Sequence, residues 1–227
     1  MTNVTTGLVI GYGSVGRRHS QALATLAPAL TIVERQEWAR QLAVREHPAA
    51  RVVDRLEALD GAGFPWASAL AVIATWGPSH ASLFHLLVDR GVERVLCEKP
   101  MASSVCDAWA MVERAERGRV ALAVDHYMRY VGLAPALHRL AIEHQLGEPV
   151  AMVVTGGAAC LLTNGIHWID FAAELFGGAP RQVLSTGYGD AINPRSPDLL
   201  LYGGTAVWDF GGHREAVIAF NNRSSVA

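Results

Sequence analysis

The 227-residue sequence predicts an α/β protein, in which a doubly wound parallel sheet is followed by an α+β domain with an open, mainly antiparallel sheet. Short β-branched runs alternate with Ala- and Leu-rich stretches over the first 125 residues, as parallel strands with crossover helices require. A glycine-rich turn follows the first apolar run directly. After Asp125 the alternation stops, so the expected domains are residues 1–125 and 126–227.

The first domain contains alternating strand and helix candidates joined by short segments with Gly or Pro, such as Gly77-Pro78. The last of its helices opens with Ser103-Ser104 and Asp107, an N-cap and an early acid that suit the positive end of a helix. The expected strands are Leu8–Ile10, Leu30–Glu34, Arg51–Asp54, Ala69–Ala74, Arg94–Cys97 and Val120–Val124. The expected helices are Val15–Leu26, Glu37–Glu46, Ser79–Arg90 and Ser103–Arg117.

The second domain has a different pattern of helices and strands. One helix candidate ends at Gly177-Gly178, which matches a glycine C-cap. Two late apolar runs are joined by Gly211-Gly212-His213-Arg214 and predict an antiparallel hairpin. The expected elements are helices Ala134–Gln145 and Gly165–Phe176, strands Val150–Thr155, Thr205–Phe210 and Glu215–Phe220, and a Pro- and Gly-rich loop from Tyr188 to Tyr202.

Composition excludes several classes of protein. With 51% apolar and 18% charged residues, the chain is neither disordered nor fibrous. A formal charge of −2 without a basic cluster argues against a nucleic-acid partner. Met1–Thr6 lacks the features of a signal peptide, and no apolar run approaches the roughly 20 residues that span a bilayer. Three cysteines, Cys97, Cys106 and Cys160, have no metal-site spacing and cannot all pair with one another, which favours a reducing compartment. We therefore expect a cytoplasmic protein without a membrane partner.

The motif Gly11-Tyr12-Gly13-Ser14-Val15-Gly16 lies between a strand and a helix, the context of a dinucleotide-binding fingerprint. Gly11 permits the tight turn, Gly13 lets a pyrophosphate approach the backbone, and Gly16 lets the helix pack close to the strand. The free amides at the start of the helix then meet the anion. We therefore predict an N-terminal Rossmann domain.

The residues after the second strand candidate predict which dinucleotide binds. Glu34 lies where a carboxylate can accept hydrogen bonds from the adenosine ribose, so NAD is favoured over NADP. Arg35 can partly compensate by pairing with a 2′-phosphate, which leaves NADP possible.

Glu98-Lys99-Pro100 directly follows a strand candidate, at the sheet edge where ligands of open α/β folds bind. Pro100 holds Lys99 in extended geometry and so directs its side chain. Two interpretations stay open. Lys99 acts on a ligand, or Glu98 simply pairs with Lys99 or caps a helix.

The order and spacing of three segments resemble the Gfo/Idh/MocA family of oxidoreductases over essentially the whole chain. The segments are Ala74-Thr75-Trp76-Gly77-Pro78-Ser79-His80, Cys97-Glu98-Lys99-Pro100 and Asn164-Gly165-Ile166-His167-Trp168-Ile169-Asp170. The resemblance implies an N-terminal domain that binds NAD or NADP. It also implies a C-terminal domain whose open sheet holds a sugar or cyclitol and forms homo-oligomers.

By this resemblance Lys99 orients and polarises the reacting hydroxyl or carbonyl, and His167 accepts the proton during oxidation. His80 lines the nicotinamide edge, although helix capping by Ser79 explains that segment equally well. Arg129 lies on the substrate side, although an interdomain salt bridge explains it equally well. The implied cofactor contacts beyond the glycine motif are Thr75, His80, Glu98 and Lys99, and the implied substrate contacts are Lys99, Arg129, Thr163, Asn164 and His167.

The chain departs from the family pattern in two ways. Family members commonly carry Asp four residues before the catalytic histidine, whereas this chain has Thr163. They also continue well past the equivalent of Ala227, so we expect an incomplete second domain that depends on association. His167 and Asp170 share a helix face with Thr163 and Glu174 but lack a third ligand, so we expect no catalytic metal.

These observations predict an NAD(P)-dependent oxidoreductase that transfers a hydride between nicotinamide and a hydroxyl-bearing carbon of a sugar, sugar derivative or cyclitol. One alternative is a non-catalytic dinucleotide-binding sensor or regulatory protein on the same scaffold, favoured by Thr163. The other is a related reductase that acts on an imine or tetrapyrrole, which Lys99 and His167 disfavour.

Overall fold

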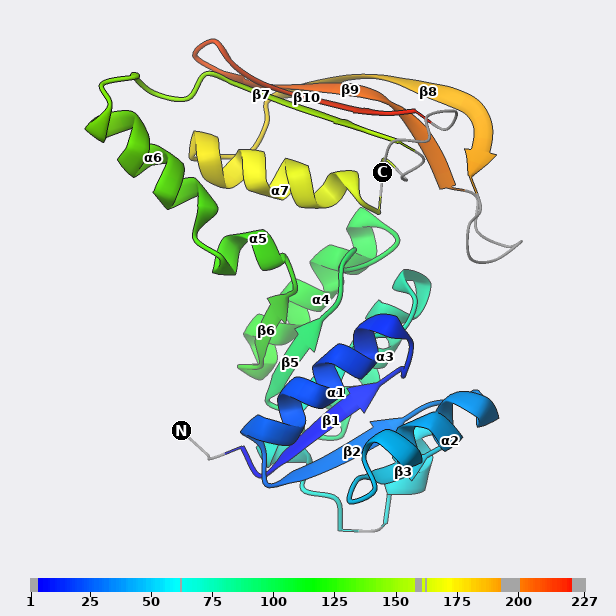
Figure 1. Ribbon diagram of the computed structural model, residues 1–227. Helices are drawn as coiled ribbons and strands as arrows, with labels where there is room; N and C mark the ends of the chain where they lie inside the picture. The colour runs from blue at the N-terminus through cyan, green and yellow to red at the C-terminus, as the bar shows by residue number, and fades with distance from the viewer. Residues whose placement is uncertain (1–3, 62, 158–160, 162, 193–200, 222–227) are drawn as a thin grey trace. The chain divides into compact units, whose positions relative to one another are not determined.

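The computed structural model of the chain describes residues 4–61, 63–157, 161, 163–192 and 201–221 (Figure 1). Contacts within the chain divide it into two compact units, Met1–Asp125 and His126–Ala227. None of the helices in the described part of the chain combines the length and apolar character needed to cross a bilayer.

Unit 1 is built on a six-stranded sheet with the strand order β3-β2-β1-β4-β5-β6 (Figure 1). All of its strand pairs are parallel. The direction in which successive strands are added to the sheet reverses between β1 and β4, which are neighbours. Such a sheet is doubly wound and binds ligands at the carboxyl ends of its strands. The strands are β1 (Thr6–Ile10), β2 (Ala29–Val33), β3 (Arg51–Val53), β4 (Ala69–Ile73), β5 (Arg94–Cys97) and β6 (Ala121–Val124).

Helices cover both faces of this sheet, which explains why its strands are nearly continuous apolar runs. Leu8 and Ile10 of β1 pack into a core with Phe84 and Met111, whereas Val9 packs into a second core with Leu23. The helices are α1 (Ser14–Leu26), α2 (Glu37–Glu46), α3 (His80–Asp89) and α4 (Val105–Gly118), and short 3₁₀ turns cover Leu56–Leu59, Trp66–Ser68 and Gly77–Ser79.

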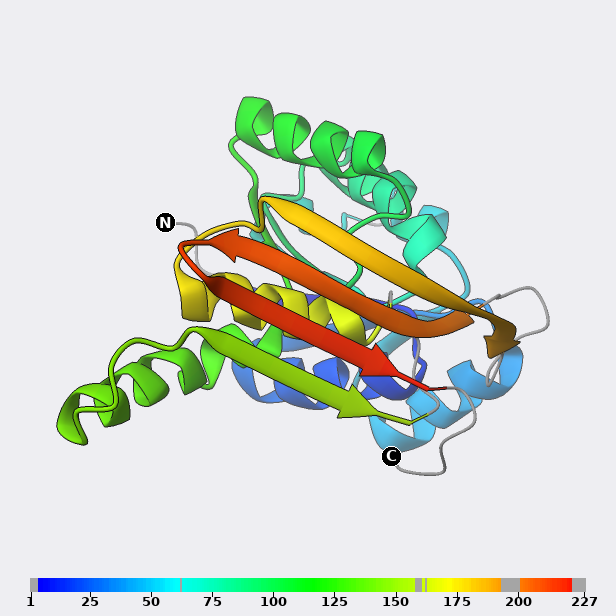
Figure 2. The same ribbon diagram turned by 90° about the horizontal axis from the view of Figure 1, so that it is seen from above.

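Unit 2 contains a four-stranded sheet with the strand order β7-β10-β9-β8. The β7–β10 pair is parallel and the other two pairs are antiparallel, so the sheet is mainly antiparallel, as predicted. Helix α7 covers one face, and the described residues place no helix on the other face (Figure 2). The elements are α5 (Tyr127–Tyr130), α6 (Leu133–Glu143), β7 (Ala151–Gly156), α7 (Gly165–Phe176), β8 (Gln182–Ile192), β9 (Leu201–Gly211) and β10 (Arg214–Phe220).

The local signals at the helix ends and at the hairpin are confirmed. Ser104 Oγ accepts a hydrogen bond from the Asp107 N–H, and Gly177 ends α7 in the left-handed region with a φ of 72°. Strands β9 and β10 form the expected antiparallel pair. The loop expected from Tyr188 to Tyr202 is wrong at both ends, because β8 extends to Ile192 and β9 begins at Leu201, while residues 193–200 lie outside the described residues.

Candidate active site

The glycine motif forms the tight turn between β1 and α1. Gly11 has a φ of +94°, and a Cβ on it would lie 2.7 Å from the Ala74 carbonyl oxygen, so only glycine fits there. A Cβ on Gly16 would lie 1.9 Å from the Gly11 carbonyl oxygen, because the helix starts so close to the strand. A Cβ on Gly13 would meet no atom within 4 Å, which leaves open space over this backbone. The turn is therefore closed on the protein side and open on the ligand side.

The start of α1 is free to bind an anion. Gly13 is the N-cap residue, and neither a side-chain cap nor an acidic residue occupies the first turn. Ser14 and Val15 are exposed in that turn. The backbone N–H groups at the start of this 13-residue helix, together with its dipole, suit a pyrophosphate. The open space over the Gly13 backbone also suits a pyrophosphate, so these residues fit a bound dinucleotide.

Glu34 links the end of β2 to this turn. Its Oε2 accepts a hydrogen bond of 2.6 Å from the Tyr12 N–H, and its Oε1 accepts one of 2.7 Å from the Gln36 N–H. Each carboxylate oxygen has a second lone pair, which a ribose hydroxyl can use. Arg35 follows as an exposed residue. The roles of both residues in cofactor selection stay predictions.

The Tyr12 side chain is not accessible to a ligand, so the predicted cofactor contact of Tyr12 depends on its backbone and stays a prediction. The side chain is fully buried, and its hydroxyl donates a 2.7 Å hydrogen bond to Glu46, which Arg17 also binds. Burial, followed by the hydrogen bond and charge of Glu46, raises the pKa of Tyr12 well above its usual value. Tyr12 is therefore a neutral structural residue between the glycine turn and α2.

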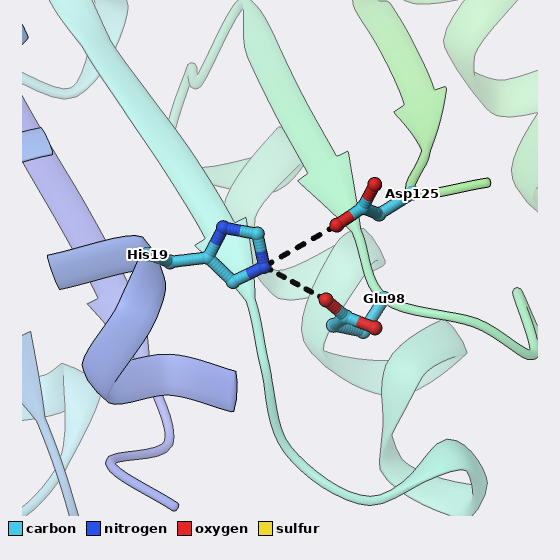
Figure 3. Close-up of side chains that lie close together, drawn as sticks. All are labelled: His19, Glu98 and Asp125. Atoms are coloured by element: carbon cyan, nitrogen blue, oxygen red, sulfur yellow. Dashed lines mark hydrogen bonds and ion pairs between the residues drawn. The ribbon is translucent and has the colours of Figure 1, made fainter. Parts of the chain in front are cut away.

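Glu98, which follows β5, pairs with His19 of α1, although the two residues lie far apart in the sequence. His19 Nε2 lies 2.7 Å from Glu98 Oε1 and 3.7 Å from Asp125 Oδ2 (Figure 3). The Glu98 residue is only 8% exposed, and its Oε2 accepts a 3.3 Å hydrogen bond from the Lys99 N–H. Glu98 therefore pairs with His19, a partner that neither of the two interpretations from the sequence includes. A direct contact of Glu98 with the cofactor stays a prediction.

The Glu98 ion pair makes the stability of the protein depend on pH. Burial opposes ionisation, but the hydrogen bond and charge of His19 and the Lys99 N–H lower the pKa of Glu98 below its usual value. A carboxyl group whose pKa is lowered by folding stabilises the protein above its unfolded pKa of about 4.3. That stabilisation is lost as the pH falls through the folded-state pKa.

We therefore expect Glu98→Gln to lower the free energy of unfolding by about 1–3 kcal/mol near neutral pH, because His19 loses an ionised partner. The difference from the wild type should shrink as the pH falls below the unfolded pKa of about 4.3 and vanish below the lowered folded-state pKa of Glu98, where the wild-type carboxyl group is protonated too. Urea unfolding of both proteins at a series of pH values measures this difference in the free energy of unfolding. As a control, Glu113→Gln removes an exposed ion pair with Arg117 and should change stability by less than about 0.5 kcal/mol. An E98Q difference that does not vary with pH would contradict the assignment.

His19, Glu98 and Asp125 also bring three potential metal-ligand atoms within 4.8 Å of one another. The sequence pattern indicates only His167 and Asp170 as candidate ligands and does not reveal this group, because its members lie far apart in the chain. His19 Nε2 and Glu98 Oε1 already form a short contact, which accounts for the cluster without an ion. The cluster is best described as an ion pair with a second carboxylate nearby.

His80 is fully buried, so its predicted position at the nicotinamide edge needs correction. Its Nδ1 lies 2.9 Å from the Pro100 carbonyl oxygen, and its Nε2 lies 3.0 Å from the Thr75 carbonyl oxygen. The ring thus bridges the segments after β4 and β5 instead of facing a ligand. The capping explanation is also wrong, because Ser79 makes no side-chain cap. Thr75 Oγ1 lies 2.8 Å from Ser79 Oγ, and its contact with a cofactor stays a prediction.

In unit 2, His167 lies on α7 and packs against Tyr127 of α5 and against His126, the residue that precedes α5. Its ring is 5.1 Å from the ring of Tyr127 and 6.0 Å from that of His126, centre to centre, both edge to face. Arg129 donates three hydrogen bonds of 2.8–2.9 Å to Asp170, one turn further along α7. The expected interdomain salt bridge of Arg129 is thus wrong, because both partners belong to unit 2.

The remaining predicted substrate residues come directly before α7. Asn164 is its N-cap residue, is exposed and makes no side-chain cap, and Thr163 is half-buried. Lys99 and His167 belong to different units. Their joint action, like the substrate contacts of Arg129, Thr163 and Asn164, stays a prediction.

Cys97 provides no nucleophile despite its position next to Glu98. Burial, and to a lesser extent the Glu98 charge, raises the pKa of its thiol to about 12. The thiol therefore stays protonated at neutral pH. Cys97 is fully buried and packs as a small apolar side chain, and Cys160 lies outside the described residues.

Comparison with known proteins agrees with this geometry. Residues 6–126 match the model of an oxidoreductase family with an NAD-binding Rossmann fold, GFO_IDH_MocA. The chain is 35% identical over 130 residues to D-apiose dehydrogenase of Paraburkholderia graminis, covering 50% of this chain and 34% of that protein. It is 29% identical over 153 residues to inositol 2-dehydrogenase of an Arthrobacter species, covering 65% and 44%. The chain thus spans less than half the length of these curated relatives.

Solved structures support the fold of both units. The WlbA dehydrogenase of Bordetella pertussis, solved with NADH and UDP-GlcNAcA, is similar with a TM-score of 0.78 at 21% identity, covering 98% of this chain and 68% of that one. The family match covers more than half of the chain and includes both the glycine turn and Glu98-Lys99-Pro100. The chain belongs to the Gfo/Idh/MocA family of oxidoreductases, and residues 6–126 form its NAD-binding Rossmann domain.

Proposed function

We propose that the chain is part of an NAD-dependent dehydrogenase that oxidises a hydroxyl-bearing carbon of a sugar, sugar derivative or cyclitol. The observation that carries the proposal is the position of Lys99. It follows β5 at the carboxyl edge of the same parallel sheet whose glycine turn accepts a dinucleotide. Ligands of such sheets bind at this edge, and this position supports a role of Lys99 in substrate chemistry.

Each residue has a distinct task in this proposal. Bound NAD supplies the hydride acceptor. The Lys99 ammonium donates a hydrogen bond to the reacting oxygen and stabilises the negative charge that develops there. His167 takes the hydroxyl proton on a ring nitrogen, as a general base does. Thr163 and Asn164, which come directly before α7, orient the remaining hydroxyl groups.

The names of the relatives support the substrate class. D-apiose is a sugar and inositol is a cyclitol, and the proteins with these names are 35% and 29% identical to this chain over 130 and 153 aligned residues. A polyhydroxylated substrate also suits the polar face on α7, where His167, Asp170 and Glu174 follow one another at helical spacing.

A screen of sugars, sugar acids and cyclitols for absorbance of reduced nicotinamide tests the proposal. Substrate-dependent reduction of NAD is the expected result. Binding of NAD without reduction by any compound would favour the non-catalytic sensor. Reduction of an imine or tetrapyrrole, with no turnover of polyols, would favour the second alternative from the sequence.

NAD should bind more tightly than NADP, by about tenfold or more. The Glu34 carboxylate accepts from a free 2′-hydroxyl and repels a 2′-phosphate. Glu34→Gln should reduce this preference, since the amide keeps an acceptor oxygen for Tyr12 or Gln36 but removes the charge. Titration of both oxidised cofactors measures the effect. Glu37→Gln, an exposed change on α2, should leave the preference unchanged; tighter binding of NADP to the wild type would contradict the prediction.

We also propose that the open face of the sheet in unit 2 associates with a second copy of the chain. Val153, Val217, Val207 and Leu184 pair in register across all four strands. The residues that flank Val207 and Val217 are buried in the core with α7, and side chains alternate along a strand, so this apolar row lies on the opposite face. Val153 and Leu184 are 67% and 76% exposed. An apolar row of this kind on an open sheet favours association.

Val153→Asp should therefore shift the chain from dimer to monomer, because a charge in the row would be buried without a partner. Sedimentation velocity at several protein concentrations measures the shift. Ile142→Asp is a matched control, since Ile142 is 75% exposed on α6, outside the sheet. A wild-type chain that is monomeric at high concentration, or a V153D variant that stays dimeric, would contradict the proposal.

A further inference from the structure

We propose that His19 and His80 are positioning residues that hold Lys99 from both sides. The two histidines come from different helices, α1 and α3, and each contacts one neighbour of Lys99 in the chain. His19 pairs with the Glu98 side chain, and His80 contacts the Pro100 carbonyl group. The inference rests on the proposed function of Lys99 and adds two residues to that site.

The contact of His19 fixes the residue before Lys99. Carboxylates only accept, so His19 Nε2 donates to Glu98 Oε1 across 2.7 Å. The other oxygen of the same carboxylate accepts the Lys99 N–H at 3.3 Å, so the carboxylate connects the helix to the Lys99 backbone itself. Asp125 Oδ2, 3.7 Å from the same nitrogen, adds a second negative charge at the end of the neighbouring strand (Figure 3). A charge-assisted contact at a site only 8% exposed is strong and geometrically demanding.

The contact of His80 fixes the residue after Lys99. Its ring is completely buried between two carbonyl groups, 2.9 Å from that of Pro100 and 3.0 Å from that of Thr75. Carbonyl oxygens only accept, so the ring donates to at least one of them whichever nitrogen carries the hydrogen. His80 thereby ties the segment after β5 to the segment after β4, next to the glycine turn that touches Ala74.

These two contacts have a functional consequence. A flexible lysine side chain acts well only when its backbone is held within a fraction of an ångström, since a shift of about 1 Å in a reacting group can cost on the order of 10²-fold in rate. Neither histidine needs to touch substrate or cofactor. Loss of either contact should therefore lower kcat while leaving the affinity for NAD nearly unchanged.

The sequence offers a direct probe of this geometry, because Lys99 is the only lysine in the chain. Reductive methylation with ¹³C-formaldehyde therefore labels Lys99 and the terminal amine alone. The NMR shift of the dimethylated Lys99 reports on its surroundings, and the rate of labelling reports on its accessibility. Both measurements work without any substrate, so they test the positioning of Lys99 separately from the proposed reaction.

The test compares His19→Ala, His19→Gln and a pair of changes at His80. His19→Ala should move the Lys99 signal and lower kcat by about tenfold to 100-fold. In His19→Gln the side-chain amide N–H takes the place of Nε2–H, so the Lys99 signal and kcat should both return most of the way to their wild-type values. His80→Asn keeps a donor at the position of Nδ1, toward Pro100, whereas His80→Gln keeps one at the position of Nε2, toward Thr75. If the Pro100 contact holds Lys99, the asparagine variant should be the more active of the two.

Gln21→Ala on α1 and His85→Ala on α3 are matched controls and should leave the signal and kcat unchanged. An unmoved Lys99 signal in both His19→Ala and His80→Gln would overturn the inference, and so would a moved signal without loss of kcat. If the wild type turns over no polyol, the proposed function fails, while the Lys99 signal still decides whether the histidines position it. If His19→Ala does not fold, the comparison of the two His80 variants carries the test.

Discussion

Lys99→Ala and His167→Ala should each lower the turnover number by about 10²- to 10⁴-fold, with little change in the affinity for NAD. Removing Lys99 leaves the developing negative charge on the reacting oxygen without its donor. Removing His167 leaves the proton without an acceptor. Neither side chain belongs to the glycine turn that binds the dinucleotide. Steady-state kinetics with a substrate from the screen, together with NAD titrations, measure both effects.

Two further variants sharpen this prediction. His144→Ala changes an exposed histidine after α6 and should leave turnover unchanged. Lys99→Arg keeps the positive charge but places it in a longer, planar group, so it should restore only a small part of the activity. Near-native turnover of either alanine variant would show that the role carried over from the family does not apply to that residue.

Gly13→Ala and Gly16→Ala should both abolish NAD binding, with a loss of affinity of at least about 100-fold, but only one should destabilise the fold. A Cβ on Gly16 would lie 1.9 Å from the Gly11 carbonyl oxygen, so helix and strand must separate. Such overpacking costs about 1–3 kcal/mol or more. A Cβ on Gly13 meets nothing within 4 Å and occupies only the space that a pyrophosphate would enter.

Thermal unfolding and NAD titration of both variants distinguish the two effects. The expected pattern is normal stability without NAD binding for G13A, and loss of both for G16A. Gly61→Ala is unsuitable as a control because Gly61 has a φ of +73°, whereas Gly178→Ala adds a Cβ to open space and should change neither property. NAD binding by G13A at wild-type affinity would mean that the dinucleotide does not approach this backbone.

The sequence by itself predicts unit 1 almost completely, because its structure follows from local patterns. Strands buried on both faces must be continuous apolar runs, as Ala69–Ile73 is, and the helices between them show their ends through residues such as Ser104. The glycine motif is equally local, since Gly11 and Gly16 are required by a single turn. Most expected boundaries in this unit differ from the observed ones by only a residue or two.

In unit 2 the sequence predicts most of the elements, but it misses β8 and does not show which face of α7 is buried. Helical spacing predicts a core stripe of Ile166, Ile169, Ala173 and Phe176 on α7, whereas its buried large side chains are Phe171, Leu175 and Phe176. In a helix that is apolar on most sides, periodicity cannot choose the buried face, so packing against β9 and β10 decides it. Strand β8 was missed for a related reason. Val183 and Leu184 are adjacent and both exposed, so its strand character comes from pairing with β9.

The contacts around the candidate site needed the tertiary structure, because they join residues far apart in the chain. No spacing rule connects His19 with Glu98, or Arg129 with Asp170. The sequence marks His80 as a residue of the site, but only the fold shows that its ring lies between two carbonyl groups instead of facing a ligand. Local sequence patterns determine where strands, helices and turns form. Which side chains meet at the ends of the strands depends on how those elements pack.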